Sequence, residues 1–482
     1  MGRVNAGPWL WQRAQAAAGA PAVETDSRHV TFAELAAGAD QVARRLAGCG
    51  VRAGERVAVV ADPCLRTIEI VHAVSRLGAV LVPIGTRLTA AEVAQLVAFV
   101  RPALVVHDGR HGDRVPADSI DMHDGLDAAS LAPADVLHDV LDPDDLHSIV
   151  FTSGTTATPK GAMLTHGAHL ASALGSAARL GTTSRDRWLV CMPLTHVGGL
   201  AIVLRSVITG FALVVQERFD PARVNGAIAN QGITTVSVVA TMLARMLEEL
   251  GERGYPATLR CVLLGGGPLP PGLLAQATEQ RVPIVPTYGL TEACSQVATA
   301  MPGAPITGAH AAGRPLAGVE VRIGSARPDG VGEILVRGAT LMRGYLDDEA
   351  ATHAALARGW LHTGDLGRLS PGGELTVEGR LSDVIVTGGE NVVPDEVEAI
   401  LRMHPVIADA AVYGVPDEYW GERVLAALVV RGDDLDEPAL REWCRGRLAG
   451  FKVPAAFRRV AALPRTASGK LLRRALLSEA AQ

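Results

Sequence analysis

The chain has 482 residues, which is too long for one ordinary hydrophobic core, since such cores stop growing near about 250 to 300 residues. Hydrophobic residues make up 48% and charged residues 20% of the chain, a composition that is typical of globular proteins and excludes a largely disordered one. The formal net charge of −6 offers no overall positive field to nucleic acid or anionic lipid. We therefore expect at least two folding units and no nucleic-acid partner.

Cysteine use and apolar patterning bear on the compartment. The six cysteines include no CxxC pair, which disfavours a zinc site or a disulfide framework. The N-terminus lacks the apolar core of a signal peptide, and the longest apolar stretch, after residue 197, is interrupted by Arg205 before it could span a bilayer. We expect a cytoplasmic protein without a membrane span. Whether it forms a homodimer stays open.

Strand and helix patterns alternate over the first hundred residues. Thr31 with Glu34, and Thr89 with Glu92, have the spacing of capping boxes and predict two helix starts. The strand candidates in this part are short and apolar, at 56–60, 79–84 and 103–106, with a helical stretch at 65–77. This β-α-β-α-β order predicts a parallel sheet with helices on both faces.

Later segments continue the alternation after a polar interruption. Residues 108–146 have no clear period and predict a surface connection. Further strands are predicted at 148–151, 236–240, 260–266 and 283–289, and then, on a smaller scale, at 384–386, 409–415 and 427–432, with helices at 394–402 and 437–448. We place a domain boundary at Arg380, which gives residues 1–380 and 381–482.

The segment FTSGTTATPKG, 151–161, suits a polyphosphate. Its hydroxyl side chains can donate hydrogen bonds, Gly154 lets the backbone approach closely, and Lys160 adds a positive charge. Its spacing differs from the GxxxxGK[ST] loop, which excludes a P-loop nucleotide-binding protein. Taken alone, the segment is equally compatible with a polar turn.

A second segment, YGLTEA, follows the strand at 283–289. The ring of Tyr288 can stack on a purine, the hydroxyl of Thr291 can reach a phosphate, and Glu292 can hold Mg²⁺ through oxygen. The glycine run at 265–267 could form a floor for a flat ring. Each feature alone also fits a core tyrosine, an acid at a helix start or a glycine turn.

Three more segments carry polar groups. Asp365 in WLHTGDLG can accept hydrogen bonds from two ribose hydroxyls. Arg380 stands at the domain boundary, before a turn at Gly388 and Gly389, and Lys470 lies in PRTASGK near the C-terminus. A turn aspartate and a solvated lysine are the usual interpretations of such residues in isolation.

Together, and in this order, these five segments resemble the adenylate-forming superfamily of acyl-CoA synthetases, peptide-synthetase adenylation domains and luciferases. The resemblance covers nearly the whole chain. It implies an α/β fold, with a large N-terminal domain of β-sheets sandwiched with helices and a small mobile α+β C-terminal domain. It also implies ATP, Mg²⁺ and coenzyme A as cofactors, and a small carboxylic acid that is converted to an acyl adenylate and then to a thioester.

The resemblance also assigns roles to residues. It implies a phosphate-binding loop made of Thr152, Ser153, Gly154, Thr155, Thr156 and Lys160. It implies an adenine site made of Gly265, Gly266, Gly267, Pro268, Thr287, Tyr288 and Gly289.

The remaining roles follow from the same resemblance. Thr291 would contact the α-phosphate and Glu292 the metal, while Asp365 and Arg380 would hold the ribose. Gly388 and Gly389 would border the nucleotide, and Lys470 would bridge the acyl carboxylate and the α-phosphate. Ser382, where Asp or Lys is commoner, would be the hinge of the C-terminal domain. Ala157 stands where the loop usually has glycine.

The acyl pocket is expected around MPLTHVGGL. The resemblance implies His196, Gly198, Gly199, Gly289 and Gln296 as substrate-binding residues, with His196 also in a catalytic role, although a lone histidine between apolar runs is as often structural. This segment and its neighbours look like those of the ligases that act on o-succinylbenzoate in menaquinone synthesis.

Because that substrate has two carboxylates, its unreacted one needs polar or cationic partners. The candidates are Arg205, Thr241, Ser295 and Gln296. For Arg205 we favour a surface position with the side chain reaching solvent. The alternatives are another aryl- or fatty-acyl-CoA synthetase, a free-standing enzyme that loads a carrier protein, or a nucleotide-binding protein without catalysis.

Overall fold

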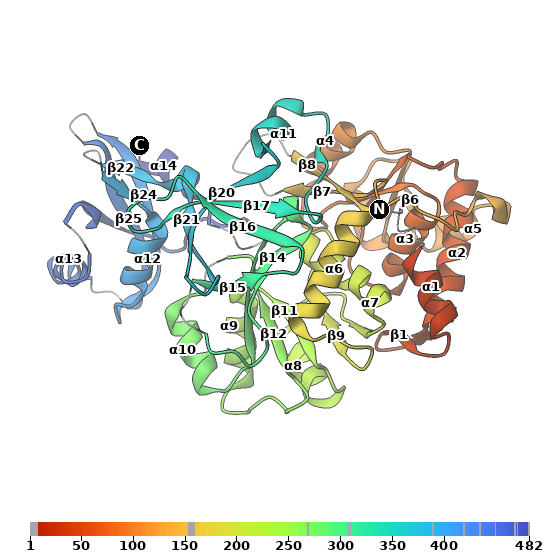
Figure 1. The fold of residues 1–482 in the computed structure, drawn as a ribbon, viewed down its shortest axis with the longest axis horizontal. Coiled ribbons are helices and arrows are strands. Elements are labelled where there is room, and N and C mark those ends of the chain that lie inside the picture. Colours follow the sequence, from red (N-terminus) through yellow and green to blue (C-terminus); the bar gives the residue numbers. More distant parts are fainter. Residues whose placement is uncertain are drawn as a thin grey trace.

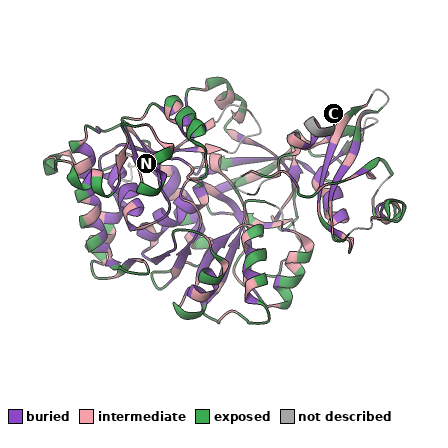
Figure 2. Cartoon of the chain, turned by 180° about the vertical axis from the view of Figure 1, so that it is seen from behind, coloured by how far each residue is buried: buried purple, intermediate pink, exposed green. Residues whose placement is uncertain are grey.

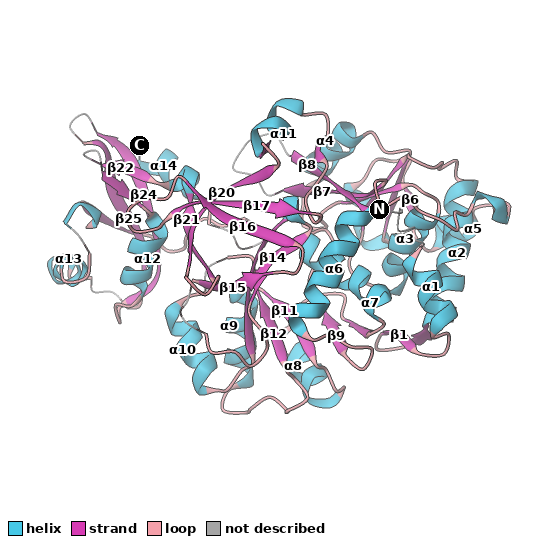
Figure 3. Cartoon of the chain, in the orientation of Figure 1, coloured by secondary structure: helices cyan, strands magenta, loops and turns pink. Residues whose placement is uncertain are grey.

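The computed structural model describes residues 8–152, 160–267, 269–306, 308, 310–387, 390–417, 420–432, 435–448, 450–466, 469 and 471–480. Two sheets and most helices form the large N-terminal part, and a third sheet forms the smaller C-terminal part, drawn in blue in Figure 1. Figure 3 shows helices against the strands in both parts. This is the predicted α/β fold with a large and a small domain.

A seven-stranded sheet with the order β18-β8-β7-β4-β3-β5-β6 begins the N-terminal domain. Its strands are β3 (Arg56–Val60), β4 (Val80–Pro83), β5 (Leu104–His107), β6 (Ile120–Asp121), β7 (Leu146–Thr152), β8 (Lys160–Thr165) and β18 (Gly344–Tyr345). The strand β3 pairs in parallel with both β4 and β5. The predicted parallel sheet is therefore confirmed.

Helices cover both faces of this sheet because β3 is apolar on both sides. Val57 and Val59 share a core with α2 (Phe32–Gly48) and α3 (Leu65–Arg76), whereas Ala58 and Val60 face α4 (Ala90–Val100). Both predicted capping boxes are present at the starts of α2 and α4. The local helix signals and the two-sided burial of the strand thus agree.

Residues 108–146 are more than a surface connection, so that prediction is wrong. The segment adds β6 to the sheet in parallel with β5, and forms α5 (Asp124–Ala128), whose Leu126 is buried. Strands of two residues are too short to give a detectable alternation of polar and apolar residues.

A fourteen-stranded sheet forms the rest of the N-terminal domain, with the order β16-β17-β20-β21-β15-β14-β13-β12-β11-β9-β10-β1-β2 and β19 paired to β20. Its strands are β1 (Pro21–Glu24), β2 (His29–Thr31), β9 (Arg187–Val190), β10 (Ala212–Val215), β11 (Thr235–Val238), β12 (Cys261–Leu264), β13 (Ile284–Leu290), β14 (Ser295–Thr299), β15 (Ala311–Pro315), β16 (Val319–Gly324), β17 (Gly332–Gly338), β19 (Leu356–Ala357), β20 (Trp360–Leu369) and β21 (Leu375–Arg380). The pairing is parallel from β9 to β13 and antiparallel from there to β16.

The other N-terminal helices pack on these sheets. They are α1 (Trp9–Ala16), α6 (His166–Leu180), α7 (Val197–Thr209), α8 (Pro221–Asn230), α9 (Ala240–Leu250), α10 (Pro271–Glu279) and α11 (Glu349–Ala355), with 3₁₀ turns η1 (Gly109–Arg114), η2 (Ala134–Val136) and η3 (Thr291–Ala293). Figure 2 shows burial concentrated along the strands and exposure on the outer sides of the helices.

The C-terminal part has its own five-stranded sheet and two cores. Its elements are η4 (Leu381–Asp383), β22 (Ile385–Thr387), β23 (Glu390–Val392), α12 (Pro394–Arg402), β24 (Ile407–Asp417), β25 (Gly421–Val430), α13 (Glu437–Arg445), η5 (Gly450–Lys452), β26 (Ala456–Arg459) and α14 (Arg473–Ala480). Along β24, Ala410 and Val412 pack with α12 and α13, while Ala411 and Tyr413 pack with α14. The alternation predicted at 409–415 thus serves two apolar layers.

Two further features concern the cysteines and the helices. All six cysteines are unpaired, and four of them are buried. None of the helices in the described ranges combines the length and the apolar character needed to cross a bilayer.

Candidate functional site

Three of the predicted nucleotide-binding residues contact one another. The hydroxyl of Tyr288 donates to Asp365 Oδ2 at 2.6 Å, and Arg380 Nε lies 2.7 Å from Asp365 Oδ1. Asp365 and Arg380 are opposite each other on β20 and β21, and Tyr288 comes from β13. Burial, with Asp365 nearby, raises the pKa of Tyr288, so the phenol stays a donor. Segments far apart in the chain thus meet at one carboxylate.

Glu292 and Lys160 meet at a tyrosine that the sequence reasoning missed. Tyr345, on β18, donates its hydroxyl to Glu292 Oε1 at 2.8 Å, and Lys160 Nζ lies 5.2 Å from the centre of its ring. Burial and Glu292 raise the pKa of Tyr345, and the charge of Arg380 only partly opposes the rise in the pKa of this tyrosine and of Tyr288. Arg380 therefore joins the two groups electrostatically.

The hairpin β7–β8 fixes the base of the expected phosphate loop. Thr152 and Lys160 are paired across it, and the hydroxyl of Thr152 donates to the carbonyl of Lys160 at 3.4 Å. Gly161 is required next to them, because a Cβ there would lie 2.8 Å from Ile149 Cγ2. The intervening predicted residues, Ser153, Gly154, Thr155 and Thr156, with Ala157, lie outside the described residues.

A strained turn follows Glu292. Cys294 and Ser295 have φ values of 52° and 91°, which non-glycine residues rarely adopt and which are common at functional sites. Gly289 stands opposite this turn, where a Cβ would be 1.8 Å from the Ser295 carbonyl oxygen. Thr291 and Glu292 are within η3, and the Glu292 carbonyl accepts from the Met342 amide at 2.8 Å. The turn holds Glu292 between β13 and β14.

The glycine run after β12 is packed at its start and has free space beside its last residue, Gly267. Gly265 packs on Thr287, since a Cβ would lie 2.8 Å from Thr287 Cγ2, and Gly266 has φ +82°. Among the described residues, no atom lies within 4 Å of a Cβ built on Gly267. Pro268 lies outside the described residues. This geometry suits a tight floor beside the strand β13.

Thr287 and Gln296 are both engaged in hydrogen bonds within the sheet. Thr287 Oγ1 is 2.8 Å from Thr299 Oγ1, and Gln296 Nε2 donates to Thr299 Oγ1 at 2.9 Å. Gln296 is buried and its Oε1 has no partner among the described residues. Its amide therefore orients the β13–β14 pair.

His196 is the N-cap residue of α7, at the expected acyl pocket. Its side chain keeps contact with solvent, yet the surrounding protein, with the charge of Arg87, lowers its pKa. The neutral imidazole is thus favoured. Gly199 is required beneath it, since a Cβ would be 2.2 Å from the Pro193 carbonyl oxygen, whereas a Cβ on Gly198 would meet Met192 Cε at 3.6 Å.

Arg205 is buried, so the predicted surface position is wrong. It is 3% exposed, its Nη2 is 3.4 Å from Ser172 Oγ, and its Nε has no hydrogen-bond partner among the described residues. Ser172 in turn donates to the Cys294 carbonyl at 2.6 Å. Burial lowers the pKa of Arg205 to about 10, so the guanidinium is charged at neutral pH. Within the described ranges no carboxylate is within ion-pair distance of it.

Four buried histidines form a cluster, and one of them, His169, lies near Arg205. Their spacing in the sequence carries no signal of this grouping. The ring of His147 lies 4.7 Å from that of His169 and 5.0 Å from that of His166, measured between centroids. Burial lowers the pKa of His72 and His169 to about 3 and that of His166 to about 4, and places that of His147 well below its usual value. The cluster is neutral at physiological pH.

The segment that carries Lys470 reaches the N-terminal domain. Lys470 itself lies outside the described residues, as do Gly388 and Gly389, but a Cβ built on Gly469 would be 3.7 Å from Thr241 Oγ1. Thr241 is two residues from Val239, which packs beside Gly266. The backbone of Ser382 is in η4, directly after β21. The fifth predicted segment thus adjoins the glycine floor.

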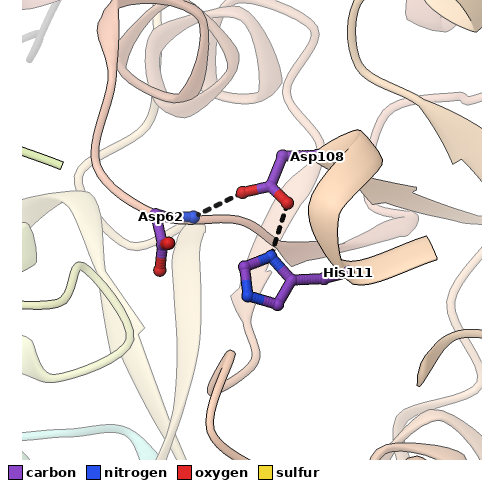
Figure 4. Close-up of side chains that lie close together, drawn as sticks. All are labelled: Asp62, Asp108 and His111. Carbon is purple, nitrogen blue, oxygen red and sulfur yellow. Dashed lines mark hydrogen bonds and ion pairs between the residues drawn. The ribbon is translucent and has the colours of Figure 1, made fainter. Parts of the chain in front are cut away.

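A second polar cluster consists of Asp62, Asp108 and His111, shown in Figure 4. His111 Nδ1 is 2.5 Å from Asp108 Oδ1, and the Asp62 amide donates to Asp108 Oδ2 at 3.0 Å. Asp62 itself accepts from Thr86 at 2.9 Å and pairs with Arg218 at 3.1 Å. Although these acids and the histidine lie close enough to share a metal ion, their oxygens already have protein partners. The cluster is an ion-pair network.

Comparison with known proteins agrees with this geometry. Residues 10–346 match the AMP-binding enzyme family, and residues 396–470 match the AMP-binding enzyme C-terminal domain. The chain is 44% identical over 474 residues to the 2-succinylbenzoate–CoA ligase of Geobacillus kaustophilus, covering 97% of this chain and 96% of that protein. Over 477 residues it is 39% identical to that of Bacillus mycoides, covering 97% of each.

Solved structures show the same similarity. The o-succinylbenzoate CoA synthetase of Bacillus subtilis, in complex with its acyl-adenylate intermediate, has a TM-score of 0.91 and 37% identity over 98% of both chains. The same enzyme with ATP and magnesium ion has a TM-score of 0.91 and 36% identity, covering 98% of this chain and 100% of that one. The chain therefore belongs to the AMP-binding enzymes, the adenylate-forming superfamily of acyl-CoA synthetases.

Proposed function

We propose that the chain is an ATP-dependent o-succinylbenzoate–CoA ligase of menaquinone synthesis. The observation that carries this proposal is the convergence of Tyr288, Asp365 and Arg380 with Glu292 and Lys160 at one place in the fold. The similarity to 2-succinylbenzoate–CoA ligases over almost the whole chain supports the substrate. The unpaired cysteines are compatible with a cytoplasmic location.

The reaction has two half reactions. In the first, a carboxylate oxygen of the acid attacks the α-phosphorus of ATP and pyrophosphate leaves, giving the acyl adenylate. In the second, the coenzyme A thiolate attacks the acyl carbon and AMP leaves. The first step brings two anions together, so positioned cations and donors must stabilise the developing charge.

The proposed roles follow from this requirement. Tyr288 and the floor at 265–267 take the adenine, and Asp365 with Arg380 takes the ribose hydroxyls. Thr291 donates a hydrogen bond to an oxygen of the α-phosphate, Lys160 neutralises phosphate charge, and Lys470 bridges the acyl carboxylate and the α-phosphate. These assignments place cations where both reacting groups are negative.

Glu292 is suited to hold Mg²⁺. Its Oε1 accepts a hydrogen bond from Tyr345, and a carboxylate keeps further lone pairs for a hard cation, which prefers oxygen ligands. The metal would supply charge neutralisation at the phosphates. Glu292 is fixed for this by the turn at Cys294 and Ser295.

Arg205 gives a physical reason for a dicarboxylate. A buried guanidinium without a described counter-ion is costly, and a ligand carboxylate would compensate it. Its hydrogen-bonded path through Ser172 ends at Cys294, in the strained turn before β14. Arg205 is also on α7, the helix that begins at the proposed acyl pocket with Gly198 and Gly199. We propose that Arg205 holds the unreacted carboxylate of o-succinylbenzoate.

The domain arrangement is part of the proposal. We place the boundary at Arg380 and the hinge at Ser382, which would let the C-terminal domain rotate between the half reactions. Support comes from the separate cores of residues 385–476 and from Gly469, which lies against Thr241 of the N-terminal domain.

A matched substrate panel tests the function. With ATP, Mg²⁺ and coenzyme A, we expect o-succinylbenzoate to be preferred over 4-oxo-4-phenylbutanoate, which lacks only the ring carboxylate, and over benzoate, which lacks the whole succinyl side chain. A preference for either monoacid, or for a medium-chain fatty acid, would reject the substrate. Faster acyl transfer to a phosphopantetheinylated carrier protein than to coenzyme A would reject the acceptor.

A further inference from the structure

Two arginines flank the position of the proposed catalytic lysine. Arg465 and Leu471 form an isolated β-bridge, and the Gly469 amide donates to the Thr466 carbonyl at 2.8 Å. Arg465 Nη1 also donates to the carbonyl of Gly469, the residue before Lys470, at 2.9 Å. The chain therefore returns to Arg465 at Leu471, and the side chain of Arg465 is bonded to the backbone between them.

Arg465 is the first member of a chain of ion pairs. Its Nη2 is 2.5 Å from Asp409 Oδ2, and Asp409 Oδ1 is 3.0 Å from Arg402 Nε. Arg402 Nη2 is in turn 3.1 Å from Glu398 Oε2. The chain thus runs from the turn, across β24, to α12.

From Glu398 the chain continues to the hinge. Glu398 Oε1 is 2.8 Å from Arg473 Nη2, and Arg473 Nη1 is 2.7 Å from Asp383 Oδ2. Arg473 also pairs with Asp395. Asp383 is the last residue of η4 and directly follows Ser382. The two arginines that flank position 470 are therefore joined, through alternating charges, to the residue beside the proposed hinge.

The centre of this chain is shielded from solvent. The side chains of Glu398, Arg402 and Arg473 are 2%, 17% and 17% exposed, so salt screens their attraction little. Burial alone would raise the pKa of Asp409, but Arg402 and Arg465 together lower it. Glu398 also accepts from the Val412 amide at 2.8 Å, and Arg473 Nε donates to the Val412 carbonyl at 3.1 Å. The charges are thus fixed to the backbone of β24.

We propose that this chain of ion pairs positions the Lys470 loop relative to the hinge for the adenylation half reaction, with Arg465 and Arg473 as positioning residues. All members lie on the C-terminal side of Ser382, so a rotation at the hinge moves them as one body. Gly469, the described residue before position 470, then meets Thr241 in a set orientation. The inference rests on the proposed role of Lys470.

The experiment compares the two half reactions in the full-length enzyme. Adenylation is followed by ATP–pyrophosphate exchange with o-succinylbenzoate, and thioester formation by supplying the acyl adenylate with coenzyme A. For Arg465→Gln we expect kcat of adenylation to fall about tenfold to a hundredfold, because a small misplacement of a reacting group is costly. The KM for ATP and the rate of thioester formation should stay within about twofold.

Three further variants make the result specific. Arg465→Lys keeps a charge for Asp409 but loses the forked donor to Gly469, so it should recover only part of the rate. Arg431→Gln, which removes another exposed arginine bound to a backbone carbonyl of the same domain, should leave both half reactions unchanged. Lys470→Ala should abolish adenylation and spare thioester formation.

The outcomes separate the two claims. An equal loss in both half reactions for Arg465→Gln would mean that the domain is damaged, and it would overturn the positioning role. Unchanged adenylation in Arg465→Gln, with adenylation lost in Lys470→Ala, would overturn the positioning role alone. Unchanged adenylation in Lys470→Ala would overturn the proposed role of Lys470, and the inference with it.

Discussion

Arg205 on α7 and Glu398 on α12 both carry charge away from solvent, with exposures of 3% and 2%, but their surroundings differ. Arg205 lies beside Ser172, which donates to the Cys294 carbonyl, and near the neutral His169, without a described counter-ion. Glu398 lies between Arg402 and Arg473 and accepts a backbone hydrogen bond. A balanced cluster fixes the protein's own geometry, whereas an unbalanced one retains the capacity to bind an ion.

The largest effect is expected where the charge is balanced. Glu398→Gln removes the buried carboxylate that Arg402 and Arg473 share, while Asp409 still pairs with Arg402, and Asp383 and Asp395 still pair with Arg473. The loss of stability should therefore stay below the about 3 to 5 kcal/mol that an unpaired buried charge costs. We expect the unfolding transition of the C-terminal domain, followed by calorimetry, to shift to lower temperature. Glu442→Gln, which breaks an exposed pair with Arg445, serves as the control and should leave this transition in place. An unshifted transition in Glu398→Gln would show that the cluster does not hold the domain.

At Arg205 the same kind of change should have the opposite effect on stability. Arg205→Met removes an uncompensated buried charge, so thermal stability should be kept or raised. The kcat/KM for o-succinylbenzoate should fall about a hundredfold, since losing a buried charge partner costs about 2 to 5 kcal/mol.

Substrates supply the control for this variant. Turnover of 4-oxo-4-phenylbutanoate, which lacks the benzoate carboxylate, should change less than about fivefold in Arg205→Met, and Arg205→Lys should keep part of the preference. Equal losses for the diacid and the monoacid would contradict a carboxylate-binding role for Arg205.

The histidine cluster near Arg205 predicts a smaller, pH-dependent effect. Because burial lowers the pKa values of these histidines to about 3 or 4, below about pH 6.5 the unfolded chain binds protons that the native chain does not. Stability is therefore full above that pH and declines as the pH falls toward 4. Each histidine contributes up to about 1.4 kcal/mol per pH unit.

His147 allows this to be tested without losing a hydrogen bond, since neither ring nitrogen has a described partner. His147→Phe should make the urea midpoint less dependent on pH between 7.5 and 5.5 than in the parent protein. His353→Gln, at an exposed position, should not alter this dependence. A parent protein that is equally stable at both pH values would exclude proton-linked destabilisation by the cluster.

Local signals made much of the fold predictable. The two capping boxes, the strand at 56–60 and the helix at 394–402 follow from patterns confined to a few neighbouring residues, and each is confirmed. The segment 108–146 failed because its elements are too short to show a period.

The site was predictable only in part, because its contacts join distant residues. The sequence marks Tyr288 and Asp365 separately, but their hydrogen bond spans 77 positions. Tyr345 stands between Lys160 and Glu292 without belonging to any motif. The predicted surface position of Arg205 is wrong because the sequence shows that a charged residue interrupts an apolar run, but it does not show which other elements cover that residue.

The strand β24 has a consequence for changes in chain length. Its alternate side chains serve two apolar layers, while its backbone at Val412 bonds to Glu398 and Arg473. Deleting one residue here would exchange the two faces for everything beyond the deletion, turning Val412 toward α14 and withdrawing its peptide groups from both charges. A substitution in this strand changes one side chain, whereas a one-residue insertion or deletion changes both faces. We therefore expect natural variation in chain length to occur in the turns on either side of β24.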